Sequence, residues 1–599
     1  MREFSVKALY DVPAGGNLAD LISRNAAESP DRAVLARKVA GQWHDVTAAA
    51  FLDEVRAVAK GLIASGVRPG ERVALMSRTR YEWTLLDFAI WSAGAVSVPI
   101  YETSSAEQVA WVIGDSGAVA CVVETAAHQA LVTGVREELP LLKEVWQIDA
   151  GAVDELTAVG GDVSDAQLAE HGSTVEADSL ATIVYTSGTT GRPKGCMLTH
   201  RNFLAECGNI IIRNQPLFSA DSSMLLFLPL AHVLGRVIQV GALMAPVKLG
   251  HVSDVKNLPD ELVSFRPTFL LGVPRVFEKV YNSARAQARA SGKGKIFDRA
   301  VDTAIEYSKA LETASGPGLA LRLRHAVFDR LVYGRLRAVL GGRATHALSG
   351  GAPLGERLGH FYRGLGFTVL EGYGLAESCA ATTMNPYDRQ KIGTVGLPLP
   401  CSAVRIADDG EILLKGEHLF SGYWNNEAAT ASVFSEDWFH TGDLGSLDED
   451  GYLRITGRKK EILVTAGGKN VAPAVIEDRI RAHPLIAECM VVGDARPFIG
   501  ALITIDEEFL PRWAEQNGRP AGVSVADLRD DPAFLAEIQH GVDDGNGAVS
   551  RAESVRRFRI LDVQFTEASG HLTPSLKLKR MAVLQDYAAE IEAIYADGQ

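Results

Sequence analysis

Apolar residues recur in two alternating rhythms along the first two-thirds of the chain. Short runs rich in β-branched residues predict strands at residues 72–76, 119–123, 181–185, 269–273 and 367–370. The stretches between them, such as residues 51–64, space their apolar positions three and four residues apart, as one face of a helix does. Strands that alternate with helices in this way predict parallel sheets covered by helices, an α/β fold.

After residue 400 the pattern changes to closely spaced short strands. Residues 404–414 predict a hairpin with Asp409 and Gly410 at its turn, and a second pair of strands surrounds Asp450 and Gly451. The polar cluster at 456–461 precedes a mixed α/β segment. We therefore expect an N-terminal domain of layered sheets and helices with a β-rich subdomain (1–457), a hinge (458–461) and a small, mobile C-terminal α+β domain (462–599).

Composition narrows the classes of function. The 599 residues are 47% hydrophobic and 22% charged, which is typical of a globular protein, and the net charge of −14 argues against general nucleic-acid binding. The six cysteines form no Cys-x-x-Cys pair, so neither a disulfide framework nor a zinc site is indicated. The first residues lack a signal-peptide core, and no stretch approaches about 18 uninterrupted apolar residues. We expect a cytoplasmic protein; peripheral contact with the inner face of a membrane and the oligomeric state stay open.

One region departs from the acidic average. Residues 281–343 contain twelve Lys and Arg but five Asp and Glu. Two interpretations are open. The segment is a solvated helical face whose arginines cover neighbouring apolar surface, or it is an electropositive region that meets the phosphates of a ligand or an anionic membrane.

Residues 185–195, Tyr-Thr-Ser-Gly-Thr-Thr-Gly-Arg-Pro-Lys-Gly, follow the β-branched run 181–184 and so leave a buried strand as a loop. The glycines let the backbone approach an anion, the hydroxyls add donors and the lysine adds positive charge. A Walker A loop is excluded, because Pro193 precedes the lysine and Gly195 follows it. The pattern predicts a polyphosphate cradle formed by Thr186, Ser187, Gly188, Thr189, Thr190, Gly191 and Lys194.

Further motifs follow in order along the chain. They are Leu-Pro-Leu-Ala-His-Val at 228–233, Ser-Gly-Gly-Ala-Pro at 349–353, Glu-Gly-Tyr-Gly-Leu-Ala-Glu-Ser at 371–378, Trp-Phe-His-Thr-Gly-Asp-Leu-Gly at 438–445, Gly-Arg-Lys-Lys-Glu at 457–461 and Leu-Thr-Pro-Ser-Leu-Lys-Leu-Lys-Arg at 572–580. Singly, each has a bland explanation, such as a Gly-Pro turn, a buried histidine or a solvated lysine.

Together and in this order, the motifs resemble those of the adenylate-forming superfamily of acyl-CoA synthetases, luciferases and peptide-synthetase adenylation domains. The resemblance spans residues 180–580, and residues 438–477 closely resemble the fatty-acyl-CoA synthetase signature. It implies the adenylate-forming enzyme fold and a long-chain fatty-acid–CoA ligase whose small-molecule partners are ATP, a fatty acid and CoA, with Mg²⁺ as cofactor.

The resemblance also implies roles in the nucleotide site. Tyr373 would stack on adenine, Asp443 would bind the ribose hydroxyls, and Arg458 would reach the ribose or a phosphate. Glu377 and Thr186 would hold Mg²⁺, for which a carboxylate is a suitable hard ligand. The remaining nucleotide contacts are expected from Gly350, Gly351, Ala352, Glu371, Gly372 and Gly374. Ala376 stands where the family commonly has Thr, so one hydroxyl contact to the α-phosphate is missing.

Three more roles follow from the resemblance. Lys577 is the best match to the catalytic lysine, with Lys579 as its rival; Lys460 corresponds to the pivot of the hinge; and His232 lies between the nucleotide and acyl sites. Apolar residues at 203–212, 233–243 and 269–273 are the expected acyl lining.

The implied reaction converts ATP, a fatty acid and CoA into acyl-CoA, AMP and diphosphate through an acyl-adenylate. Two alternatives remain at this point. One is a fatty acyl-AMP ligase that loads a carrier protein, and the other is a nucleotide- or acyl-binding protein without catalysis.

Overall fold

The computed structural model describes residues 1–186, 192–219, 221–573 and 577–596. Within this part of the chain, the strands form six sheets. The first sheet has the order β7-β6-β4-β5-β8-β9, and its pairs are parallel except the last, β8 with β9. Its strands are β4 (Arg72–Met76), β5 (Val96–Ile100), β6 (Ala120–Val123), β7 (Glu144–Gln147), β8 (Leu180–Thr186) and β9 (Lys194–Thr199).

Alternate residues of β4 explain how helices cover both faces of this sheet. Val73 and Leu75 belong to the main hydrophobic cluster, together with residues of α2 and α3, whereas Ala74 and Met76 belong to a second cluster with residues of α4 and α5. The helices of this layer are α1 (Asp20–Glu28), α2 (Ala48–Ala64), α3 (Tyr81–Ser92), α4 (Ala106–Ser116), α5 (Ala126–Gly134), α6 (Ala152–Val159) and α7 (Asp165–Gly172).

Two further sheets form the second layer. One has the order β12-β13-β14-β15-β16 and the other β10-β11-β2-β3. Their strands are β2 (Ala33–Val39), β3 (Gln42–Thr47), β10 (Ser223–Leu226), β11 (Lys248–His251), β12 (Phe269–Gly272), β13 (His346–Ser349), β14 (Thr368–Tyr373), β15 (Thr383–Met384) and β16 (Leu397–Pro398). The helices of this region are α8 (His200–Arg213), α9 (Val233–Met244), α10 (Leu258–Phe265), α11 (Pro274–Ala290), α12 (Gly294–Ala310), α13 (Leu319–Phe328), α14 (Gly334–Val339) and α15 (Glu356–Gly364).

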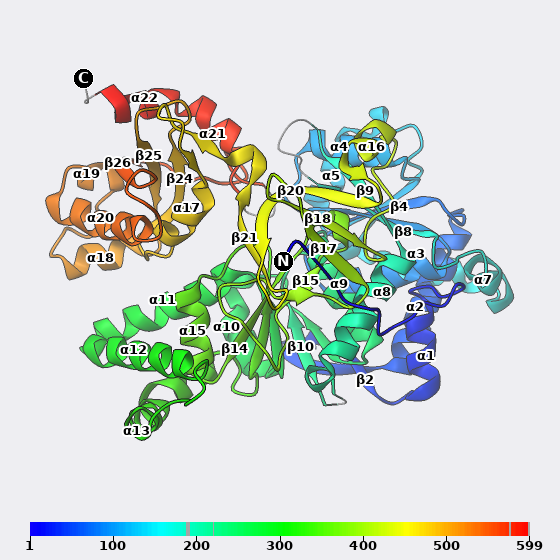
Figure 1. Ribbon diagram of the computed structural model, residues 1–599. Coiled ribbons are helices and arrows are strands. Elements are labelled where there is room, and N and C mark those ends of the chain that lie inside the picture. The colour runs from blue at the N-terminus through cyan, green and yellow to red at the C-terminus, as the bar shows by residue number, and fades with distance from the viewer. Residues whose placement is uncertain (187–191, 220, 574–576, 597–599) are drawn as a thin grey trace.

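The β-rich region is a twisted sheet of β1, β17, β18, β20, β19 and β21 (Figure 1). Both predicted hairpins are present, and Gly410 has the positive φ of +86° that its turn requires. The strand β1 (Glu3–Ser5) pairs with β17 across about 400 residues of chain, which no local pattern foretold. The other elements here are β17 (Ser402–Ile406), β18 (Glu411–Gly416), α16 (Glu427–Val433), β19 (Phe434–Ser435), β20 (Trp438–Leu447) and β21 (Leu453–Arg458).

The chain after the 3₁₀ turn Lys459–Glu461 packs around hydrophobic clusters of its own, one of them centred on Ile476, Ile503 and Phe534. Its elements are β22 (Leu463–Val464), β23 (Asn470–Val471), α17 (Pro473–Arg481), β24 (Ile486–Val492), β25 (Ile499–Ile505), α18 (Leu510–Gln516), α19 (Val525–Leu528), α20 (Pro532–Asn546), β26 (Val555–Leu561), α21 (Arg580–Asp586) and α22 (Ala588–Ala596). We call this part the C-terminal part; its independence and mobility stay predictions.

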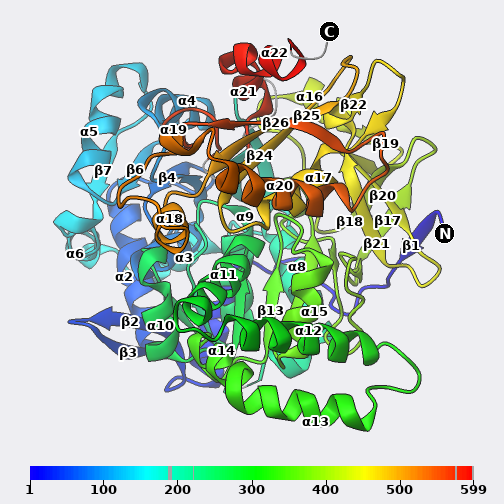
Figure 2. The same ribbon diagram turned by 90° about the vertical axis from the view of Figure 1, so that its left-hand side faces the viewer.

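The C-terminal part, orange and red in Figure 1, lies over α11 and beside β21, and Figure 2 shows it facing the viewer. Polar contacts join it to the rest of the chain. Thr103 donates a hydrogen bond of 2.8 Å to Glu567, and Arg275 and Lys279 of α11 pair with Glu488 and Glu508. No described helix combines the length and the apolar composition that crossing a bilayer demands.

The sequence predicted the element types well in the α/β region. The strand at 72–76 has the predicted bounds, β6 and β12 are one residue shorter than predicted, and β8 is one residue longer at each end. The predicted strand 367–370 extends to Tyr373, because Gly372 and Tyr373 pair with β15. The polar cluster at 456–461 is not wholly a linker, since its first three residues complete β21.

We predict that the packing of α11 against α17 weakens as the pH rises through neutrality. Burial raises the pKa of Glu278 on α11 to about 7 and that of Asp478 on α17 to about 6. The neighbouring acids Asp478 and Glu488 also raise the pKa of Glu278, whereas Arg481 and Arg275 lower it. Each carboxyl therefore keeps a proton in the packed state that it would release if exposed. This stabilisation is complete below about pH 4 and is lost as the pH rises through about 6 to 7.

Hydrogen exchange of α17 amides, corrected for the intrinsic pH dependence, measures this effect. Protection should fall between pH 5.5 and 8.5 in the unaltered protein and change less in Glu278→Gln. Lys279→Gln is the matched control, because the pair of Lys279 with Glu508 is exposed and contributes little. Identical profiles for the unaltered protein and Glu278→Gln would refute the assignment.

Candidate active site

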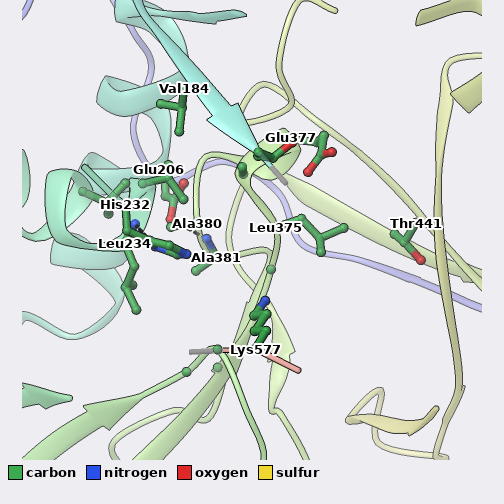
Figure 3. A pocket seen from close by; sticks show the side chains of 18 of the residues that line it. Val184, Glu206, His232, Leu234, Leu375, Glu377, Ala380, Ala381, Thr441 and Lys577 are labelled. Atoms are coloured by element: carbon green, nitrogen blue, oxygen red, sulfur yellow. Dashed lines mark hydrogen bonds between the residues drawn. The ribbon is translucent and has the colours of Figure 1, made fainter. Parts of the chain in front are cut away.

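A cavity of about 910 Å³ lies where the first two layers, the β-rich region and the C-terminal part meet. Residues far apart in the sequence line it together, from β8, α8, α9, β14, β20 and the hairpin that precedes α21 (Figure 3). Most of the predicted site residues are among them: Thr186, Lys194, His232, Gly350, Gly351, Gly372, Gly374, Glu377, Arg458, Lys460 and Lys577.

One side of the cavity is apolar. Its wall comes from α8, α9 and β12, as the sequence predicted. Helical periodicity decides which side chains of α8 and α9 line the cavity and which point into the core. Phe203 is fully buried in the core, whereas Ile210 and Ile211 on the same helix line the cavity. The other apolar lining residues include Phe218, Met224, Val233, Val237, Ile238, Phe269 and Leu271.

The start and end of the predicted phosphate loop are held by strand pairing. Thr186 at the end of β8 lies opposite Lys194 at the start of β9. Residues Ser187, Gly188, Thr189, Thr190 and Gly191 lie outside the described residues, so their predicted role as a cradle is not addressed. The Lys194 ammonium lies 5.0 Å from the centre of the Tyr423 ring, a cation–π contact that aims the lysine along the cavity wall.

Glu377 belongs to a short 3₁₀ turn, Ala376–Ser378, on the cavity wall. The Tyr423 hydroxyl donates a hydrogen bond of 2.8 Å to Glu377 Oε1. Tyr423 therefore touches both Lys194 and Glu377 and fixes their relative position. Since the tyrosine engages one oxygen, Glu377 Oε2 is available to a cation or a hydrogen-bond donor in the cavity.

The alternation of β14 divides the motif at 371–378 into two sets. Leu370, Gly372 and Gly374 line the cavity, while the side chains of Glu371 and Tyr373 leave from the opposite face of the strand. Gly374 has no room for a side chain, because an added Cβ would lie 2.0 Å from the Ala380 carbonyl oxygen. Because Gly372 and Gly374 have no side chains, a ligand in the cavity can lie directly against the backbone at the end of β14.

Glu371 supports the turn after β13 and does not line the cavity. It is buried, and it accepts a hydrogen bond of 2.9 Å from the Leu354 backbone N–H. Burial raises the pKa of Glu371 to about 7, while the bond from Leu354 opposes the shift. The turn that it braces presents Gly350 and Gly351 to the cavity, whereas Ala352 points elsewhere.

Tyr373, Asp443 and Arg458 form a connected group beside the cavity. The Tyr373 hydroxyl donates to Asp443 Oδ2 at 2.7 Å, and Arg458 Nε donates to Asp443 Oδ1 at 2.9 Å. Tyr373 and Asp443 are buried, and neither is among the lining residues, whereas Arg458, Thr441 and Gly442 are. Burial and the nearby Asp443 raise the pKa of Tyr373, so the phenol stays protonated. The predicted contacts of Tyr373 with adenine and of Asp443 with ribose stay predictions.

Lys577 reaches the cavity from a small hairpin. Leu572 and Leu578 form an antiparallel bridge, the Thr573 N–H donates to the Lys577 carbonyl, and the Lys577 N–H donates to Thr573 Oγ1 at 3.0 Å. Figure 3 shows the lysine pointing into the cavity. Lys579, the rival in the sequence, is not among the lining residues.

The protein around Lys577 changes its ionisation. Desolvation lowers the pKa of Lys577, and the nearby Arg458 lowers it further, while Asp443, Glu377 and Glu461 act in the opposite direction. The lysine is thus held among charges of both signs. A phosphate group placed in the cavity would add the negative charge that this arrangement lacks.

His232 is the N-cap of α9, and its Nδ1 accepts a hydrogen bond of 3.2 Å from the Leu234 backbone N–H. Burial lowers the pKa of His232 to about 4, and Lys577 contributes to the shift. The imidazole is therefore neutral at pH 7. Because Nδ1 accepts, the proton lies on Nε2, which can donate to a ligand in the cavity.

Sequence reasoning missed two residues of the site, Tyr423 and Glu206. Glu206 lies on α8 within an apolar stretch, and an acid at a predicted core position was the available signal. Its Oε1 accepts a hydrogen bond of 2.8 Å from the Ala381 backbone N–H, and its Oε2 is buried without a hydrogen bond. Burial raises the pKa of Glu206 well above its usual value and so favours the neutral, protonated acid.

Glu206 braces a strained turn. Cys379 and Ala380 have φ angles of +52° and +94°, a region that residues other than glycine seldom adopt, and they come directly after the turn with Glu377. Figure 3 shows Glu206 beside Ala380 and Ala381 on the cavity wall. The bond from Ala381 to Glu206 thus helps hold the backbone that positions Glu377.

The chain is similar to known enzyme families and to solved structures. The family described as AMP-binding enzyme matches residues 22–424, and the family described as AMP-binding enzyme C-terminal domain matches residues 460–599. The chain is 53% identical to the long-chain-fatty-acid–CoA ligase FadD15 of Mycobacterium bovis and 52% identical to FadD15 of Mycobacterium tuberculosis, over 99% of this chain and 100% of each relative. In fold, it is similar to the adenylation domain of a carboxylic acid reductase from Segniliparus rugosus, with a TM-score of 0.74, 22% identity and coverage of 97% and 94% of the two chains.

We predict that Glu206→Gln retains stability and activity, whereas Glu206→Ala loses both. Glutamine still accepts the Ala381 hydrogen bond and is neutral like the protonated acid. Alanine leaves the partly buried Ala381 N–H unpaired and opens a void at the buried Glu206 position, so the free energy of unfolding should fall by about 2–4 kcal/mol.

Urea denaturation at pH 7 and a pyrophosphate-exchange assay measure the two effects. If Gln were as harmful as Ala, an ionised Glu206 would be required, and the neutral-acid assignment would be wrong.

Proposed function

Since the chain belongs to the AMP-binding enzyme family, we propose that it joins a long-chain fatty acid to CoA at the expense of ATP, through an acyl-adenylate. The observation that carries the proposal is the composition of the cavity. An apolar wall from α8, α9 and β12 adjoins a polar wall that carries Lys194, Glu377, Arg458 and Lys577. A fatty acid needs the first surface and a nucleotide triphosphate needs the second.

In the first step, a carboxylate oxygen attacks the α-phosphorus of ATP, the bond to the β-phosphate oxygen breaks, and diphosphate leaves with the electron pair. The protein contributes chiefly position and positive charge to such a step. Lys577 and Arg458 would stabilise the charge on the phosphate oxygens. His232, neutral and protonated at Nε2, would donate to the carboxylate of the fatty acid and orient it.

The donor set suits Mg²⁺. The described residues contain no group of three or more acidic, histidine or cysteine side chains that would form a cage of protein ligands. Magnesium bound to a nucleotide needs few protein ligands, because phosphates and waters supply the rest. We assign this role to Glu377 Oε2 and the Thr186 hydroxyl, and the ion would neutralise phosphate charge when bound.

In the second step, the CoA sulfur attacks the acyl carbon, the bond from that carbon to the phosphate oxygen breaks, and AMP leaves. The thiol proton goes to solvent or to a basic group of the site. We propose that the C-terminal part rotates about Lys460 between the steps and withdraws Lys577. Lys460 lies in the exposed 3₁₀ turn Lys459–Glu461, which packs less tightly than the clusters on either side.

The long-chain class rests on two supports. The two FadD15 relatives bear the name long-chain-fatty-acid–CoA ligase, and the apolar wall consists of large aliphatic and aromatic side chains. We also propose that the enzyme is cytoplasmic and makes peripheral contact with a membrane.

A panel of saturated fatty acids of increasing length, each assayed with ATP and Mg²⁺, tests the function. Long acids should support exchange of labelled diphosphate into ATP without CoA, and AMP and acyl-CoA should form when CoA is added. Exchange without any CoA-dependent product would indicate an acyl-AMP ligase that serves another acceptor. Absence of exchange with every acid would reject the enzyme altogether.

We further predict that Lys577→Ala slows formation of the adenylate about 10²–10³-fold, the usual effect of losing one charge-stabilising donor. Conversion of supplied acyl-AMP and CoA to acyl-CoA should change by less than threefold or so, because the lysine is withdrawn in that step.

The matched control for this prediction is Lys579→Ala. Lys579 lies two residues away on the same hairpin but does not line the cavity. Equal losses in both half-reactions of Lys577→Ala, or a loss of adenylation in Lys579→Ala, would contradict the assignment.

A further inference from the structure

The helix α13 runs along the outside of the molecule, and none of its residues is buried. It continues through a π-helical turn, Asp329–Tyr333, into α14. In both Figure 1 and Figure 2 it forms the lower edge of the molecule, on the far side of α12 from the C-terminal part. The helix therefore takes no part in the cavity.

One face of α13 anchors the helix to the body of the protein. The His325 ring stacks on Tyr307 of α12 with centroids 3.9 Å apart, and His325 Nε2 lies 2.6 Å from the Gly364 carbonyl oxygen. Phe328 packs against the main hydrophobic cluster. The orientation of α13 is thus fixed, and its opposite face is presented to the outside.

That opposite face is apolar. Leu319, Leu323, Val327 and Leu331 recur every four residues, and their exposed fractions are 76%, 63%, 56% and 53%. We call these four residues the α13 stripe. A surface helix ordinarily turns polar residues outward, and single exposed leucines are common, but four in register on one helix form a continuous apolar ridge.

Arginines flank the α13 stripe. Residues 319–343 hold six arginines and one aspartate, in a chain with a net charge of −14. Arg324 and Arg337 pair with Glu306 and Asp329. Arg330 and Arg335 are exposed and form no ion pair with any described residue, so their charge is available to a partner.

We propose that the α13 stripe and its free arginines dock the protein on an anionic lipid bilayer. The leucine and valine side chains would enter the interfacial region, and Arg330 and Arg335 would meet lipid phosphates. A protein partner fits less well, because a standard protein interface takes about 20–30 residues a side, whereas this ridge is one helix wide. A bilayer accepts such a ridge without a complementary groove.

The surface lies outside the catalytic cavity, so docking does not depend on the proposed reaction. The two are connected only through the substrate: if the proposed function holds, docking brings the enzyme to the phase into which a long-chain fatty acid partitions. Failure of the docking would remove the membrane contact from the proposed function but leave the reaction standing, and failure of the reaction would leave the docking standing.

Co-sedimentation with vesicles tests the docking. The full-length protein should bind vesicles of phosphatidylcholine with phosphatidylglycerol, and bind vesicles of phosphatidylcholine alone much more weakly. Leu319→Gln/Leu323→Gln/Val327→Gln should lower the partition coefficient roughly tenfold or more. Arg330→Glu/Arg335→Glu should lower it by a similar factor and remove most of its dependence on salt.

The matched control is Leu141→Gln/Val159→Gln, which removes two side chains with exposed fractions of 55% and 50% outside α13. It should bind like the unaltered protein, and all variants should keep their thermal unfolding temperature. Absence of binding to anionic vesicles, or unchanged binding of the triple variant, overturns the proposal. The proposal is also overturned if the triple variant loses self-association, measured by sedimentation velocity, but still binds vesicles, because the α13 stripe would then be an interface between copies of the chain.

Discussion

A buried carboxylate, Asp443, ties together the parts of the chain that enclose the cavity. It accepts one hydrogen bond from Tyr373 at the end of β14 and another from Arg458 at the end of β21, where the chain passes to the C-terminal part. A buried acid of this kind is stable only while its partners are in place, since its charge would otherwise lie unpaired away from water. Asp443 therefore links the second layer, the β-rich sheet and the junction beside the cavity, in addition to the hydrophobic cluster that these layers share.

Burial then sets the charge of each group that faces this space. His232 is neutral because desolvation lowers its pKa to about 4, and desolvation raises the pKa of Glu206, which favours its neutral form. Lys577 shares the space with Arg458 and with acidic groups, so its charge is partly balanced before any ligand arrives. The result is a cavity with one apolar wall and one cationic wall and with neutral hydrogen-bonding groups between them, which suits a substrate with an apolar chain and an anionic head.

Three separate regions of the molecule have different proposed roles. The cavity is the candidate active site. The contact of α11 with α17 carries partly buried carboxyls with raised pKa values, while the α13 stripe lies at the opposite edge and faces outward. Because α13 is anchored on α12 and lies away from the C-terminal part, the proposed docking does not depend on the proposed rotation of that part.

The sequence by itself determined the order of strands and helices in the α/β region, both hairpins and many of the residues that line the cavity, because local periodicity and turn chemistry act over a few residues. The tertiary structure decided which face each residue takes. Alternation along β14 turns Gly372 toward the cavity and Tyr373 away from it, and pairing across the whole chain joins β1 to β17. It also decided that Glu206 is buried beside the cavity and that the α13 stripe faces outward. A helical pattern shows that an apolar face exists, but only packing against distant segments shows whether anything covers it.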